Sequence, residues 1–242
     1  MSHYIITIAR SYGAGGKQIG QMLSEKLGIP CYESQIPAMA AQFSGIRTER
    51  FTRIDEQLRM NALMHALKKA PPRDRTFFPE NHAFVSDDQL FSLQARIIQK
   101  LSKQTSCIIV GKCANYLLRD NPNIFSVYVE APRRFCVQNI RQRLGVSEAE
   151  AHQLIHRTDK YRADYYKHYT GGEDWSNPTA YDLVINTERL GYDKAVKTIL
   201  AAAKIKLGVQ MPQTDHAMTN REAELMMRAP NRAAFLHSKW FY

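Results

Sequence analysis

The sequence has little of what marks membrane, secreted or metal-binding proteins. No stretch approaches the ~18 uncharged apolar residues of a membrane-spanning helix, so no such span is expected. The first residues lack the basic start and small-residue cleavage site of a signal peptide. The chain has 4 cysteines among 242 residues, and no two have C-x-x-C spacing. We therefore expect no metal site and a reducing, cytoplasmic location.

Long runs of one charge are also missing, although the formal net charge is +10. Basic residues nowhere form an unbroken run of roughly five or six. They are spread along predicted helices, with a local excess over residues 133–167. This distribution suits a cleft for phosphorylated small molecules better than a basic tail. Nucleic acid is an unlikely partner, because the sequence has no RNA- or DNA-binding motif.

Short apolar runs alternate with segments of helical spacing. Strands are predicted at 4–9, 29–32, 107–111, 125–129 and 182–185. Helices are predicted at 17–27, 35–43, 48–69, 87–103, 133–169 and 192–207, with a break near Gly145, a capping box at Ser147 and Glu150, and a loop over 71–79. The alternation indicates an α/β fold in which a parallel sheet is covered by helices on both faces.

One domain is expected over residues 1–208, followed by a C-terminal extension over 209–242. A capping box at Thr219 and Glu222 predicts a short helix that reaches about Ala229. The final residues are too apolar for a simple disordered tail, and include Trp240 and Phe241. We expect them to dock on the domain or on the second subunit of a homodimer.

The first predicted strand leads directly into a glycine-rich loop and a helix. This segment reads Arg10-Ser11-Tyr12-Gly13-Ala14-Gly15-Gly16-Lys17-Gln18. The order directs backbone N–H groups and a helix N-terminus at one spot, as in a phosphate-binding P-loop. The glycines let the backbone approach a phosphate, and Lys17 or Arg10 adds positive charge.

The loop departs from the standard pattern G-x-x-x-x-G-K-[ST]. With Gly15 as the second glycine, Arg10 takes the place of the first glycine and Lys17 lies one position late. Gly16 then stands where the lysine belongs and Lys17 at the hydroxyl position, so a Ser or Thr after the lysine that would hold Mg²⁺ is missing. Ser11 is the nearby hydroxyl within the loop.

Two later segments also carry basic residues. Lys112 follows Gly111 at the end of a predicted strand, where it can meet a phosphate or be solvated. Arg157, Lys160 and Arg162 cluster on one predicted helix. That cluster suits a mobile lid that closes cations over a transferring phosphoryl group, although a solvated, salt-bridged helix stays an alternative.

These motifs resemble those of the cytidylate kinase-like family, a branch of the P-loop nucleoside-monophosphate kinases. Five segments of this chain follow the family's patterns in order: Arg10–Ile19, Leu27–Tyr32, Val110–Tyr116, Asp159–Tyr166 and Tyr181–Thr187. The resemblance covers about residues 3–205. It implies a three-layer P-loop kinase fold with a helical lid at about 145–180, and the residues from 209 onward form a short helical extension outside it.

The resemblance also implies ATP and Mg²⁺ as cofactors and phosphoryl transfer to a nucleoside monophosphate or another small acceptor. Catalytic roles are expected for Lys17, Asp159 and Arg162, and ATP binding for the loop Arg10–Gln18, with no dedicated metal ligand identified. The residues expected to bind the acceptor are Glu33, Ser34, Gly111, Lys112, Asn115 and Arg157. Lys112 and Asn115 stand where the family pattern has arginine and aspartate, and lysine lacks the bidentate fork of arginine.

A second function stays open at this point. The displaced lysine and the missing hydroxyl are also compatible with a non-catalytic protein that binds a nucleotide or a phosphometabolite on a kept kinase fold. A nucleic-acid binder is the third and weakest alternative.

Overall fold

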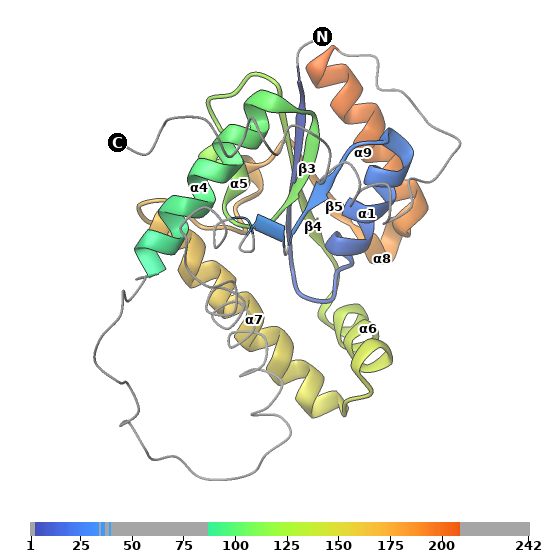
Figure 1. Ribbon diagram of the computed structural model, residues 1–242. Helices are drawn as coiled ribbons and strands as arrows, with labels where there is room; N and C mark the ends of the chain where they lie inside the picture. The colour runs from blue at the N-terminus through green and yellow to red at the C-terminus, as the bar shows by residue number, and fades with distance from the viewer. Residues whose placement is uncertain (1–2, 34, 37–38, 40–86, 209–242) are drawn as a thin grey trace, which may run out of the picture.

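The computed structural model describes residues 3–33, 35, 36, 39 and 87–208 (Figure 1). Its centre is a 5-stranded sheet with the strand order β2-β3-β1-β4-β5, in which all neighbours run parallel. The strands are β1 (Ile5–Arg10), β2 (Cys31–Tyr32), β3 (Cys107–Val110), β4 (Ile124–Glu130) and β5 (Leu183–Asn186). The predicted parallel α/β sheet is therefore confirmed.

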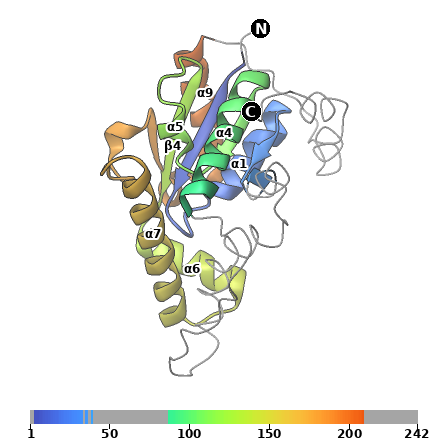
Figure 2. The same ribbon diagram turned by 60° about the vertical axis from the view of Figure 1, so that its left-hand side comes forward.

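Helices cover both faces of the sheet (Figures 1 and 2). The helices α1 (Gly16–Leu27) and α9 (Tyr192–Leu207) lie on one face, and α4 (Asp87–Gln104) and α5 (Ala114–Leu117) lie on the other. Ile6 and Ile8 of β1 belong to the first core cluster, while Ile5 belongs to the second. The strands read as unbroken apolar runs because both of their faces are buried. The expected three layers are confirmed.

Two helices extend past the carboxyl ends of the strands. These are α6 (Arg133–Leu144) and α7 (Glu148–Tyr169), which pack against each other (Figure 2). The chain breaks between them at Gly145, whose left-handed backbone (φ 67°) ends α6. The Ser147 side chain then accepts a hydrogen bond from the Glu150 amide, and the Glu150 side chain accepts one from the Ser147 amide. The predicted break and capping box are both confirmed.

Some local features differ from the sequence prediction. Gly111 lies outside β3, because its backbone turns to φ 79° directly after the strand. The elements η1 (Pro178–Ala180) and α8 (Thr187–Leu190) were not predicted, since a single turn leaves no periodic pattern. None of the described helices is both long and apolar enough to cross a membrane. The predictions for 48–69, 71–79, 209–242 and most of 35–43 fall outside the described residues.

Candidate functional site

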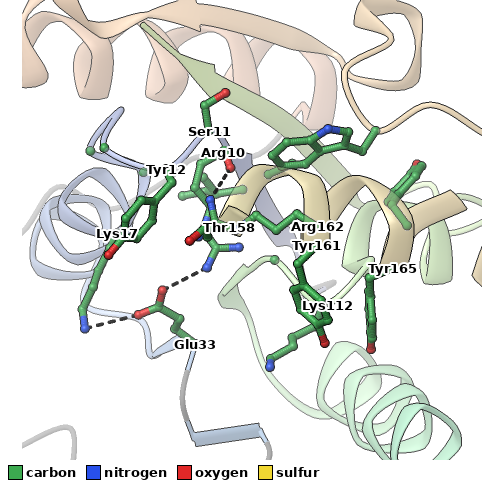
Figure 3. Close-up of a pocket in the computed structure, with 18 of the residues that line it drawn as sticks. Arg10, Ser11, Tyr12, Lys17, Glu33, Lys112, Thr158, Tyr161, Arg162 and Tyr165 are labelled. Atoms are coloured by element: carbon green, nitrogen blue, oxygen red, sulfur yellow. Dashed lines mark hydrogen bonds and ion pairs between the residues drawn. The ribbon is translucent and has the colours of Figure 1, made fainter. Parts of the chain in front are cut away.

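A cavity of about 1750 Å³ lies at the carboxyl ends of β1, β2 and β3, beside α6 and α7. It brings together most of the residues predicted for the site (Figure 3). The predicted residues that line it are Arg10, Ser11, Gly13, Gly15, Gly16, Lys17, Gln18, Glu33, Gly111, Lys112, Asn115, Arg157 and Arg162. Ala14, although part of the loop, is fully buried and does not line the cavity. Ser34 is outside the described residues.

Side chains from three helices hold the carbonyl groups of the loop after β1. The Arg162 guanidinium from α7 donates to the Arg10 carbonyl (2.9 Å), the Asn139 amide from α6 donates to the Gly13 carbonyl (2.9 Å), and the Thr187 hydroxyl from α8 donates to the Ala14 carbonyl (2.8 Å). Within the loop itself, the Ser11 carbonyl accepts from the Ala14 amide. These bonds fix the direction in which the peptide groups point.

The amide groups of the loop differ from its carbonyl groups in their hydrogen bonding. Within the described part of the chain, the amides of Gly13, Gly15, Gly16, Lys17 and Gln18 donate no hydrogen bond. Gly15 is the N-cap of α1 and supplies no capping side chain, and the first turn of α1 has no acidic residue. Consecutive open amides at the positive end of a helix dipole form a site for an anion.

Two glycines give the loop its shape. Gly15 has φ 86°, and a Cβ added there would overlap the ring of Tyr192 from α9. Gly13 has φ 93°, and a Cβ there would lie 2.7 Å from the Cys136 carbonyl oxygen. The loop is therefore packed from behind by α6 and α9. Any larger residue at these positions would push the amides out of place.

Three charged side chains meet at the cavity wall. Glu33, just after β2, forms ion pairs with Arg10 (Nη2–Oε1 3.1 Å) and with Lys17 (Nζ–Oε2 3.3 Å) (Figure 3). Arg10 and Glu33 are largely buried, whereas 55% of the Lys17 side chain is exposed. Glu33 thus neutralises part of the positive charge beside the loop.

The two α7 residues predicted as catalytic contact the loop backbone. The Asp159 carboxylate accepts a hydrogen bond from the Tyr12 amide (2.8 Å) and lies 3.4 Å from the Arg162 guanidinium. Burial raises the pKa of Asp159. Burial, with the nearby Arg10 as a second cause, lowers the pKa of Arg162 to about 9. An anion bound beside the guanidinium would favour its charged form.

The turn after β3 has an unusual backbone. Gly111, Lys112 and Cys113 follow one another with φ 79°, 60° and 54°. A left-handed conformation costs a residue other than glycine about 1–3 kcal/mol, and such strain clusters at functional sites. The Asn115 side chain is buried and donates to the Tyr166 hydroxyl of α7 (3.0 Å). The turn therefore presents Lys112 at the cavity while Asn115 connects it to α7.

Several residues of the site were not identified from the sequence. Asn139, Thr187 and Tyr192 hold the loop. Thr187 ends the last family motif, but nothing in the local sequence marks Asn139 or Tyr192. The Ser11 hydroxyl is 2.9 Å from the Tyr128 hydroxyl. The aromatic rings packed around Tyr128 are those of Tyr181 and Trp175. The sequence did mark Tyr181 and Trp175, since Tyr181 begins the last family motif and Trp175 follows a pair of glycines.

A sequence model described as the cytidylate kinase-like family matches residues 5–189. A cytidylate kinase from Thermococcus sibiricus (strain DSM 12597 / MM 739) is 30% identical over 102 residues, which are 42% of this chain and 51% of that protein. The chain thus matches about half the length of this relative. An uncharacterized protein from Eubacterium ventriosum ATCC 27560 has a similar solved structure, with a TM-score of 0.62, 22% identity and coverage of 84% of this chain and 99% of the other. The structural likeness concerns the fold.

Proposed function

The chain belongs to the cytidylate kinase-like family, and from this premise we propose that it transfers a phosphoryl group from ATP to a small acceptor, with a nucleoside monophosphate of the cytidylate type as the first candidate. One observation carries the proposal. The loop after β1 has its carbonyl groups held by α6, α7 and α8, while its consecutive amides have no acceptor within the described residues. Such an arrangement suits the phosphates of a nucleotide.

Catalysis in this proposal is positioning and electrostatic stabilisation. The amides from Gly15 to Gln18 and the Lys17 ammonium bind the donor phosphates. Arg162, 2.9 Å from the loop at the Arg10 carbonyl, supplies positive charge to the transferring group, and Asp159 fixes its position. No protein general base is needed when the acceptor is a phosphate, because its oxygen is already an anion.

The residues present fit ATP better than they fit a protein-held Mg²⁺. The described residues include no group of three or more His, Cys, Asp or Glu that could hold a metal ion. The Ser11 hydroxyl shares a hydrogen bond with Tyr128 and packs beside an aromatic cluster. Mg²⁺ is commonly held by substrate phosphates and waters, and in that role it would screen the phosphate charge. We therefore assign it no protein ligand.

The acceptor is proposed to bind beside the turn after β3. Gly111, Lys112 and Asn115 line the cavity there, Glu33 lies at the end of the neighbouring β2, and Arg157 of α7 lines the same cavity. The resemblance to the family supports the further proposal that Glu33 and Ser34 contact the acceptor's base. We also propose that α7 with the following residues to about 180 acts as the lid, and that the protein works in the cytoplasm, where its four unpaired cysteines would stay reduced.

A release assay for ADP tests the proposed function. Wild-type protein with Mg²⁺ and ATP is expected to release ADP when CMP, dCMP or UMP is added, and little without an acceptor. Arg162→Ala should lower this rate about a hundredfold or more, the size expected for losing one buried transition-state donor. Arg189→Ala, which removes an exposed arginine of α8, is the matched control and should retain the wild-type rate.

A non-catalytic nucleotide-binding protein is the second candidate. It is favoured by the displaced lysine, by the missing Mg²⁺-binding hydroxyl after that lysine, and by the ion pair of Lys17 with Glu33 (3.3 Å). Tight ATP binding without ADP release for any of the three monophosphates would select this function and contradict the kinase proposal.

A further inference from the structure

Tyr12 lies at the boundary between two parts of the loop that are bonded in different ways. Before it, the Ser11 amide donates to the Val129 carbonyl of β4 (3.0 Å), and the Arg10 carbonyl accepts from Arg162 of α7 (2.9 Å). After it, the amides of the loop glycines donate no hydrogen bond to the described residues. Tyr12 itself lines the cavity, although the proposed reaction assigns no role to its ring.

The backbone of Tyr12 makes the first contact with α7. Its amide donates to the Asp159 carboxylate oxygen Oδ1 (2.8 Å), and the same oxygen lies 3.4 Å from the Nη1 atom of Arg162. No atom of the Tyr12 side chain takes part in these bonds. They can therefore form whatever side chain stands at position 12, so a substitution there tests the contribution of the ring alone.

The ring of Tyr12 makes the second contact. The guanidinium carbon of Arg162 lies 5.5 Å from the ring centre (Figure 3), and that of Arg143, in the last turn of α6, lies 5.2 Å from it. A guanidinium within about 6 Å of a ring centre is attracted by the ring's electrons. Arg143 forms no ion pair with the described residues, so the ring is its nearby source of negative potential. One ring thus contacts arginines from both helices that extend past the strands.

The hydrogen bonds of Arg162 leave its orientation incompletely fixed. The bond to the Arg10 carbonyl and the contact with Asp159 both use the Nη1 atom, and within the described part of the chain Nε and Nη2 have no acceptor. A planar group that is bonded through one atom can still rotate about that atom. The Tyr12 ring beside it limits this rotation, and only 19% of the Arg162 side chain is exposed. The two remaining nitrogens are then held in a defined direction, as stabilisation of a transition state requires.

We infer that Tyr12 is a positioning residue, whose ring holds the Arg162 guanidinium so that its Nε and Nη2 donors face the transferring phosphoryl group. Arg143 holds the same ring from the side of α6. The hydroxyl group is not needed for this role, because a phenylalanine ring also attracts a guanidinium, whereas a leucine side chain does not. This inference rests on the proposed function, since it concerns the position of a residue that acts in that reaction.

The NMR signal of the Arg162 Nε–H group in the free protein tests the contact itself. A proton beside an aromatic ring is shifted by the ring current, and the signal is identified by its disappearance in Arg162→Ala. We expect Tyr12→Leu to move this signal and Tyr12→Phe to leave it close to its wild-type position. Tyr116→Leu is the matched control, because Arg119 lies 4.0 Å from the centre of that ring and Tyr116 does not line the cavity. It should move the Arg119 signal and leave that of Arg162 unchanged.

ADP release then separates positioning from a merely structural role. Tyr12→Leu is expected to lower kcat about tenfold, the effect of losing one partly buried contact between a cation and a ring. The KM for ATP, and the calorimetric affinity for the ATP analogue AMP-PNP, should change less than about threefold, because the ring acts in the transition state. Tyr12→Phe should restore most of kcat. In protein that already carries Arg162→Ala, adding Tyr12→Leu should lower the rate no further.

Three results would overturn the inference. They are an Arg162 signal that Tyr12→Leu leaves unchanged, equal losses of kcat in Tyr12→Leu and Tyr12→Phe, and a loss in Tyr12→Leu that lies wholly in KM. ADP release that is absent from the wild-type protein with every acceptor would instead contradict the proposed function. The NMR comparison would in that case still decide whether the ring holds Arg162.

Discussion

The proposed donor and acceptor sides of the cavity are built in different ways. The donor loop is held through its backbone, by side chains from α6, α7 and α8 and by packing against Tyr192 of α9. The acceptor side is formed by long charged side chains and by a strained turn at Gly111–Cys113. The donor side is thus formed by backbone amides that are already held in position. What the acceptor side can bind depends instead on the identity of its side chains.

This difference has a consequence for specificity. Amides are present whatever the sequence, so we expect the proposed donor loop to tolerate an atypical lysine position as long as its glycines stay. On the acceptor side, each change of side chain alters what can be bound, because charge and fork geometry are carried by single residues. Substitutions on the two sides should therefore separate donor affinity from acceptor affinity.

The largest effect is expected from Gly15→Ala. The added Cβ overlaps Tyr192 at a backbone angle of φ 86°, so the amides of the loop must move. AMP-PNP affinity measured by calorimetry should fall about a hundredfold, equivalent to about 2.7 kcal/mol. Gly172→Ala is the matched control, because Gly172 also has a positive φ (112°) but has open space around it. Equal AMP-PNP affinities in the two variants would show that the loop is not the donor site.

Thr187→Val is expected to have the next largest effect. It leaves the Ala14 carbonyl without its buried donor, which costs about 1–3 kcal/mol in general. We expect about a tenfold loss of AMP-PNP affinity and no change in CMP affinity. Thr198→Val removes a hydroxyl that donates to the Lys194 carbonyl (2.9 Å) on an exposed face, and should leave both affinities unchanged. A loss of CMP affinity alone would reverse the assignment of the two sides.

Asn115→Ala and Tyr166→Phe test the acceptor side. Each removes one partner of the buried hydrogen bond between α5 and α7, and should lower the free energy of unfolding by about 1–2 kcal/mol in urea denaturation. The double variant should lose less than the sum of the single changes, because both remove the same interaction. CMP affinity should fall with AMP-PNP affinity unchanged. Additive losses would mean that the two residues do not act as a pair.

The smallest effect is expected from Lys160→Ala. Lys160 pairs with Asp164 at 3.0 Å, but both side chains are 63% exposed. Exposed pairs of this kind contribute about 0.3–0.5 kcal/mol. The free energy of unfolding should change by no more than this, and neither nucleotide affinity should change. A marked loss of CMP affinity would assign the outer face of α7 to the acceptor side as well.

Much of the fold could be predicted from the sequence because its signals are local. Apolar runs, glycine stops and the Ser147 capping box mark strand and helix ends, and the glycine loop lies between a strand and a helix. The contacts that hold the loop could not be predicted. Asn139 is 126 positions from the Gly13 carbonyl that it contacts, and no local pattern connects them. The same holds for Asp159 and the Tyr12 amide, 147 positions apart.

On the proposed acceptor side the sequence predicted residues that line the cavity, but not their partners. The family pattern directs attention to Glu33 as a contact for a base, whereas the structure pairs it with Arg10 and Lys17. Asn115 was expected to face the acceptor, and its side chain donates to Tyr166. Such pairings depend on which long side chains meet in three dimensions, and this information is absent from spacing along the chain.

The central claim is that the open amides of the loop bind the donor phosphates. Amide chemical shifts of ¹⁵N-labelled protein, followed by NMR as Mg²⁺ and AMP-PNP are added, test it directly. The largest downfield proton shifts are expected at Gly15, Gly16 and Lys17, because an amide that donates to a phosphate loses shielding. Shifts at these amides no larger than those along the exposed face of α9, in protein shown by calorimetry to have bound AMP-PNP, would contradict the account.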